Sequence, residues 1–184
     1  MSEAAPNVPL YRNRVAGVRG WRVAPTLAAR LGGLLWSANM LTCWRHHEEL
    51  VATCEAYGHT PPADECHCGI YAWYSVEDSL DFLHDGRPGE PIFYVNGVVS
   101  GAGDMILSER GWLAQRAKVE AIFTGPGLHR LPRYSDGEEL GRGFPKRISL
   151  EMIAEAYDAE IIAPEDYEIF CLVRGLAMID PDTL

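Results

Sequence analysis

The chain has 184 residues, of which 47% are hydrophobic and 23% charged, and a formal net charge of −10. This length supports one hydrophobic core, and no apolar run approaches the roughly 18 residues of a membrane span. The acidic balance disfavours wrapping of nucleic acid, whose phosphates it would repel. It is compatible with a basic protein partner, although an acidic surface more often serves only solubility. The N-terminal sequence MSEAAPNVPLYRNR lacks the apolar stretch of a secretory signal, so we expect a cytoplasmic protein.

The first two thirds of the chain have the character of β-strands. After a flexible arm over residues 1–14, we predict a β-rich core domain over residues 15–123. The stretches VRGWRVAP (18–25) and GGLLWSANML (32–41) favour the two strands of a hairpin. The stretch CGIYAWY (68–74) has the β-branched and aromatic composition of a buried strand.

A short helix and a long hairpin complete the predicted core. Ser75 and Asp78 resemble a capping box, which predicts a helix over residues 76–86. Residues 91–123 contain strand-like runs interrupted by glycines, which is typical of bulges in a small, strongly curved or barrel-like sheet. The turn SERGW (108–112) is expected to be a charged hairpin tip.

The last third differs in composition. Residues 124–147 are rich in glycine, proline and charge and are predicted to form a loop or linker. Residues 148–160 have apolar positions at helical spacing and Ser149 as N-cap. The runs EIIAP and YEIFCLVRGLAMI that follow look like strands, so residues 148–184 are predicted to form a helix–strand appendage. The predicted class is α+β and β-rich.

Five cysteines in a chain without an export signal indicate thiols or metal ligands rather than disulfides. Cys43 and Cys171 lie in apolar or mixed surroundings and are expected to be small core residues. The other three lie within fifteen residues of one another.

These three cysteines and one histidine form the pattern C-x4-H-x6-C-x-C. The four residues are Cys54, His59, Cys66 and Cys68. Three thiolates and an imidazole are a common ligand set for a structural, tetrahedral zinc ion. Pro61 and Pro62 stiffen the intervening loop, which reduces the entropy lost when it closes on an ion. We therefore predict a turn held by structural zinc.

Other interpretations of the cluster stay open. C-x-C is rarer in zinc sites than C-x2-C, and the spacing alone fits unligated thiols equally well. Cys66 and Cys68 could form a redox pair. His46 and His47, together with Cys43, are reserve ligands, that is, further candidates to bind the metal in place of one of the four.

Two other classes of function are alternatives. An enzyme would use zinc with three protein ligands and a water molecule, or a reactive thiol pair, with a carboxylate such as Asp64 or Glu65 pointing in. A nucleic-acid-binding protein would use the basic patch HRLPRY…RGFPKR within residues 128–147.

The chain resembles a family of small actinobacterial and actinophage proteins. The resemblance rests on GWRV, LLWSANML, Trp44, ATC, GH-x-P and C-x-CGIYA, and on the later block NGVVSGAGDMILSERGWLAQRAKV. It covers roughly residues 17–123. It implies a shared fold, a shared cysteine–histidine site and a phage or mobile-element origin, and it implies no activity or substrate. The resulting hypothesis is a non-catalytic binding or regulatory module that is stabilised by structural zinc and acts on a protein partner.

Overall fold

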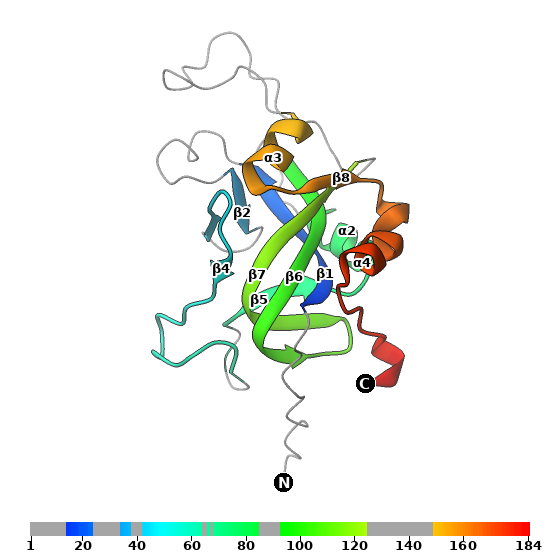
Figure 1. Cartoon of the computed structure of the whole chain (residues 1–184). Helices are drawn as coiled ribbons and strands as arrows, with labels where there is room; N and C mark the ends of the chain where they lie inside the picture. Colours follow the sequence, from blue (N-terminus) through cyan, green and yellow to red (C-terminus); the bar gives the residue numbers. More distant parts are fainter. Residues whose placement is uncertain are drawn as a thin grey trace, which may run out of the picture.

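The computed structural model describes residues 14–23, 34–37, 42–63, 66, 68–84, 93–124 and 149–184. The strands are β1 (Val15–Val23), β2 (Leu35–Ser37), β3 (Cys43–Trp44), β4 (Leu50–Val51), β5 (Ile70–Trp73), β6 (Phe93–Leu107), β7 (Gly111–Phe123) and β8 (Glu160–Ile162). The helices are α2 (Val76–His84), α3 (Leu150–Tyr157) and α4 (Tyr167–Arg174), with 3-10 turns at Pro164–Asp166 and Pro181–Thr183. Figure 1 shows the long β6–β7 hairpin running through the molecule, with α3 at one end and α4 at its side.

Four strands of the sheet form a partial ring. The long strands β6 and β7 pair with each other as an antiparallel hairpin, and the other edge of β6 pairs along the whole of β1. Strand β5 pairs with the free edge of β7 and also meets β1 through the pair Val18–Trp73. The α+β class and the strongly curved, barrel-like sheet predicted from the sequence are therefore confirmed.

The edge of β7 that faces away from β6 carries three short strands in succession. Strand β5 pairs with residues 111–114, β4 pairs with residues 116–117, and β8 pairs with residues 121–123. The first two pairings are antiparallel and the third is parallel. Strands β4 and β5 are thus neighbours on one edge, and the chain between them forms a loop beside β7 (Figure 1).

Glycines allow the ring to close around a tryptophan. A Cβ on Gly17 of β1 would lie 2.7 Å from Nε1 of Trp112, and one on Gly101 of β6 would lie 2.8 Å from the same ring. The Trp112 indole is fully buried and donates a hydrogen bond to the Ala16 carbonyl at 2.9 Å. The predicted bulges are present as register shifts in the β6–β7 pairing, one of them beside Gly103, whose φ is +82°.

The largest core cluster joins the sheet to helix α3. Trp21 and Trp44 pack edge to face with ring centroids 5.5 Å apart. The buried hydroxyl of Tyr157, at the end of α3, accepts a hydrogen bond from the Leu35 amide at 2.8 Å and donates one to the Trp44 carbonyl at 2.6 Å. Tyr157 and Ile153 belong to the same core as the β-strands.

Helix α4 occupies a segment for which the sequence predicted a strand, so that prediction is wrong. The run YEIFCLVRGLAMI was expected to be a strand, but Tyr167–Arg174 is an α-helix that ends at Gly175 with a φ of +66°. Its side chains Tyr167, Phe170 and Cys171 are buried against β-strand residues in a second core cluster. The β-branched and aromatic composition suggested a strand, and tertiary packing of one helical face overrode that preference.

Most of the other predicted elements are confirmed. Strands β1 and β2 pair as the expected hairpin, and β5 and α2 lie within the expected ranges. The Ser75 hydroxyl accepts a hydrogen bond from the Asp78 amide at 3.1 Å, as a capping residue should. Arg110, in the β6–β7 turn, forms an ion pair with Asp78, and this pair links the turn to α2.

Substitution of the α3 N-cap is expected to cost stability. The Ser149 hydroxyl accepts a hydrogen bond from the Met152 amide at 3.3 Å. Ser149→Ala removes this acceptor and is expected to lower the free energy of unfolding by about 1 kcal/mol, measured by urea denaturation. Ser149→Asp retains a capping oxygen and should stay close to the parent protein. Equal stability of all three proteins would contradict the capping role.

Two predicted segments lie almost entirely outside the described residues, namely the arm (1–14) and the linker (124–147), and so does the basic patch at 128–147. None of the helices in the described part of the chain is long and apolar enough to cross a membrane.

Candidate metal centre

The first ligand of the cluster is held in place by strand β7. After the two paired residues of β4, the Ala52 amide donates a hydrogen bond to the Gln115 carbonyl of β7 at 2.8 Å. Cys54 follows two residues later and begins a tight turn that the Gly58 amide closes on the Cys54 carbonyl at 3.1 Å. The φ of Gly58 is +67°, a conformation that glycine adopts without strain. The turn leads directly to His59.

The other two cysteines are held by the start of β5. The Cys66 amide donates to the Ala63 carbonyl at 3.0 Å, which turns the chain back towards Cys54. Cys68 is followed by Gly69, whose φ of +123° turns the chain into the first residue of β5. Because β5 pairs with the same edge of β7 as β4 does, the two ends of the loop are brought together.

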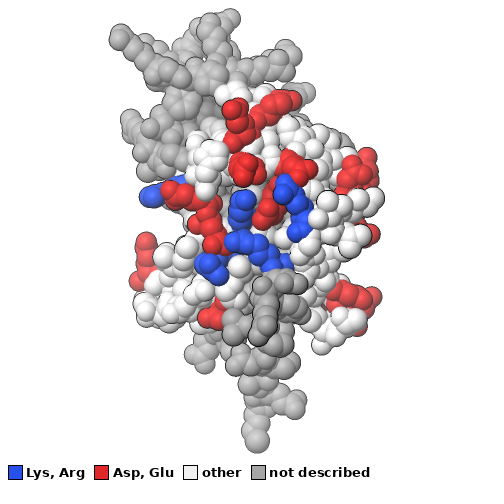
Figure 2. Space-filling model, in the orientation of Figure 1, with Lys and Arg blue, Asp and Glu red and all other residues white. Residues whose placement is uncertain are grey.

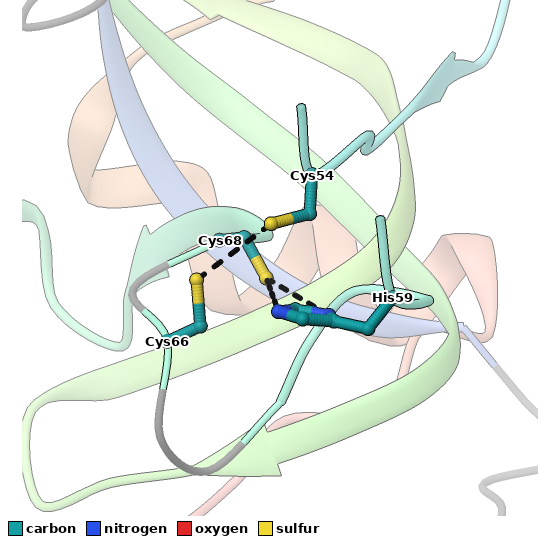
Figure 3. A group of neighbouring side chains, drawn as sticks. All are labelled: Cys54, His59, Cys66 and Cys68. Atoms are coloured by element: carbon teal, nitrogen blue, oxygen red, sulfur yellow. Dashed lines mark hydrogen bonds between the residues drawn. The ribbon is translucent and has the colours of Figure 1, made fainter. Parts of the chain in front are cut away.

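The four predicted ligands converge on one point (Figure 3). Their ligand atoms all lie within 4.8 Å of one another. The sulfurs of Cys54 and Cys66 are 3.8 Å apart, and the Cys68 sulfur is 3.8 Å from each ring nitrogen of His59.

These separations suit a tetrahedral metal ion. With Zn–S bonds of about 2.3 Å, tetrahedral geometry places two sulfurs about 3.8 Å apart. With a Zn–N bond of about 2.0 Å, it places a sulfur and a nitrogen about 3.5 Å apart. The cluster can therefore hold a metal ion, and side-chain rotation can shorten the wider separations. None of the five cysteines forms a disulfide, and a sulfur separation of 3.8 Å is far longer than a disulfide bond of about 2.05 Å.

The thiol pKa values show that the cluster tolerates one negative charge more easily than two. Burial raises the pKa of Cys54, but hydrogen bonds from nearby backbone amides and thiols outweigh it, so the pKa lies below the ordinary value. Burial, together with the hydrogen bond and the charge of the adjacent Cys66, raises the pKa of Cys68 to about 11. A second thiolate beside the first is unfavourable unless a cation shares the site.

His59 has two neighbours that orient its ring. Its Nδ1 lies 3.3 Å from the Thr60 carbonyl, which can accept a hydrogen bond from a protonated Nδ1. A metal-bound histidine usually donates its second N–H to such an oxygen, so this contact favours Nε2 as the ligand atom. The Tyr57 ring stacks on the imidazole with centroids 6.1 Å apart. Neither neighbour was predicted from the sequence, although both lie within two residues of His59.

The reserve ligands have other environments. Of the residues that the structure describes, Cys54, His59, Cys66 and Cys68 form the group close enough to share an ion. His46 instead packs edge to face on Tyr157 with centroids 5.3 Å apart, and burial lowers its pKa. His47 donates its amide to the Ala156 carbonyl. Asp64 and Glu65, the carboxylates considered for an enzyme, lie outside the described residues.

The two remaining cysteines are placed differently from each other. Cys171 is fully buried, as predicted for a core residue, and burial raises its pKa to about 11. Cys43 is half-buried at the edge of the sheet in β3, and burial also raises its pKa. Neither belongs to the cysteine–histidine cluster.

Comparison of the chain with protein-family models, with curated proteins and with solved structures gave no match. The assignment of a function therefore rests on the geometry of the cysteine–histidine cluster.

Proposed function

We propose that the protein is a non-catalytic binding or regulatory module whose fold is stabilised by a structural zinc ion and which acts on a protein partner. The observation that carries the proposal is the convergence of four ligand atoms within 4.8 Å, with a sulfur–sulfur separation that matches tetrahedral zinc. Cys54, His59, Cys66 and Cys68 are the proposed ligands.

The donor set favours zinc over other biological divalent ions. Thiolate sulfur is a soft ligand that selects zinc, copper(I) or iron–sulfur clusters, whereas magnesium and calcium require oxygen. Three thiolates and one imidazole form a common structural zinc site. Binding of the ion displaces thiol protons, and the positive charge of the ion offsets the repulsion between the thiolates that form.

A structural role follows from the number of ligands and from their place in the fold. Four protein ligands complete a tetrahedral shell and leave no position for a catalytic water molecule. The loop that carries them joins β4, which has two residues, to β5, which has four. Such short strands make few ladder hydrogen bonds, so an ion that ties their ends together supplies stability that the pairing alone lacks.

The partner is proposed to be a protein. The net charge of −10 opposes binding to nucleic acid and favours a basic protein surface. The resemblance to actinobacterial and actinophage proteins adds the proposal that a phage form of this module acts on a host protein.

Native mass spectrometry of the purified protein tests the metal site. We expect one zinc per chain, lost on chelation, and replacement by Co²⁺ should give the visible absorption of tetrahedral cobalt with thiolate charge-transfer bands. Cys66→Ser should weaken metal binding strongly, because it removes one of the four ligands. The matched control Cys43→Ser lies outside the cluster and should bind like the parent. A chain that takes up neither ion would overturn the proposal.

A further inference from the structure

The outer face of helix α4 is apolar although it faces solvent. Ile169, Leu172 and Val173 are 64%, 76% and 79% exposed. Their spacing of three and four residues places them in one stripe along the helix. Contiguous apolar surface of this kind, unlike a single exposed leucine, marks an interaction site in a soluble protein.

The opposite face of the same helix is buried, and this burial holds the helix in the orientation that exposes the stripe. Tyr167, Phe170 and Cys171 are buried in the second core cluster, and Tyr167 packs edge to face on Phe123 with centroids 6.4 Å apart. The Gly175 amide caps the helix by donating to the Leu172 carbonyl at 3.2 Å. Rotation of the helix to bury the stripe would expose these core residues. The apolar stripe is therefore presented to solvent by a fixed helix.

Acidic residues predominate in the C-terminal segment that carries the stripe. Residues 149–184 contain nine carboxylate side chains and one basic residue, Arg174. Arg174 forms an ion pair with Glu160, and its guanidinium lies over the Phe170 ring at 5.6 Å. Three of the acids, at positions 165, 166 and 168, lie in or just before α4. Figure 2 shows largely uncoloured surface towards the α4 side of the molecule, with acidic side chains near it.

We propose that the outer face of α4 is the docking surface for a basic amphipathic helix of a partner protein. The proposal rests on the proposed function as a binding module and names its surface. Apolar side chains of the partner would cover Ile169, Leu172 and Val173, and its lysines or arginines would face the carboxylates of α4. An amphipathic helix whose apolar residues recur every three or four positions matches such a stripe. A second copy of this chain fits poorly, because two acidic surfaces would oppose each other.

A designed peptide tests the surface directly. The probe is a fluorescently labelled 18-residue helix with leucine at helical spacing and lysine elsewhere, titrated with the full chain at low and moderate salt. We expect saturable binding that weakens with salt, and Leu172→Gln should weaken it at least tenfold. The matched control is Val51→Gln on β4, since Val51 is also exposed, at 55%, but lies on a different element. Its affinity should equal that of the parent.

Four further measurements distinguish the alternatives. A peptide with glutamate in place of lysine should bind much more weakly, and Glu168→Gln should reduce the affinity for the lysine peptide. Equal binding of both peptides, or equal weakening by Leu172→Gln and Val51→Gln, would overturn the proposal. So would a native mass spectrum in which the chain is a dimer that Leu172→Gln dissociates, or preferential α4-dependent binding to lipid vesicles.

Failure of the zinc proposal would be recognisable separately. The metal content is measured on the same samples, and neither Leu172 nor Val51 belongs to the cysteine–histidine cluster. If the protein contains zinc but has no affinity for the peptide, only the proposed docking surface is contradicted. If the protein is metal-free but binds the peptide through Leu172, only the proposed zinc site is contradicted.

Discussion

Chelation of the metal is expected to lower the free energy of unfolding by about 4 kcal/mol or more. An ion that binds only the folded state stabilises it by about 4 kcal/mol when its free concentration is a thousand times the dissociation constant. For a chain of this size, a loss of that magnitude lowers the unfolding midpoint by about 8–16 °C. Differential scanning calorimetry with and without a strong chelator measures the shift.

Cysteine variants identify the source of this effect. Cys66→Ser should unfold at a lower temperature and should respond little to chelator, because a ligand is already missing. Cys43→Ser keeps the whole cluster and should show the full chelator-dependent shift. If chelation removes a stoichiometric zinc ion from the parent and leaves its midpoint unchanged, the ion is not structural.

The loss of stability should begin at the strands that the loop connects. Strand β4 pairs with β7 through Leu50 and Val51, and Ala52 adds one further hydrogen bond to Gln115. Without the ion, this segment has few other contacts that prevent local opening. Amide hydrogen exchange should therefore accelerate in β4 and at the start of β5 after chelation, while the β6–β7 hairpin keeps its protection.

The substitution Tyr157→Phe is expected to lower the free energy of unfolding by about 2–4 kcal/mol. It removes a hydroxyl that accepts from the Leu35 amide and donates to the Trp44 carbonyl, all in buried surroundings. Each buried backbone group left without a partner costs about 1–3 kcal/mol. Burial raises the pKa of this tyrosine well above its ordinary value, so the hydroxyl keeps its proton and both bonds. Urea denaturation measures the difference.

Tyr57→Phe is the matched control for this substitution. The Tyr57 side chain is largely exposed, and phenylalanine retains the ring that stacks on His59. Its unfolding free energy should stay within about 0.5 kcal/mol of the parent. Equal effects of the two substitutions would show that the Tyr157 hydroxyl does not join α3 to β2 and β3.

The sequence alone identified the features that depend on neighbouring residues. Cys54, His59, Cys66 and Cys68 lie within fifteen residues, so any compact turn brings them near one another, and the structure places their ligand atoms together. The cap of α3 at Ser149 was likewise predicted from a few consecutive residues. The glycine-interrupted runs indicated the bulged, curved sheet for the same local reason.

Helix α4 shows where local composition was insufficient. The run YEIFCLVR is apolar on several sides and contains β-branched and aromatic residues, so its sequence has no clear helical or strand period. Burial of Tyr167, Phe170 and Cys171 against the sheet settled the conformation in favour of a helix. The same packing left Ile169 and Leu172 exposed, which composition cannot indicate.

By itself, the sequence determined the candidate ligand residues, the β-rich class and most element types, because these follow from residue chemistry and short-range periodicity. Only the tertiary structure decided that β4 and β5 share one edge of β7 with β8, and that Tyr157 reaches Leu35 and Trp44. Those contacts join residues up to 122 positions apart. Their partners are selected by the packing of the whole core, which no short stretch of the chain encodes.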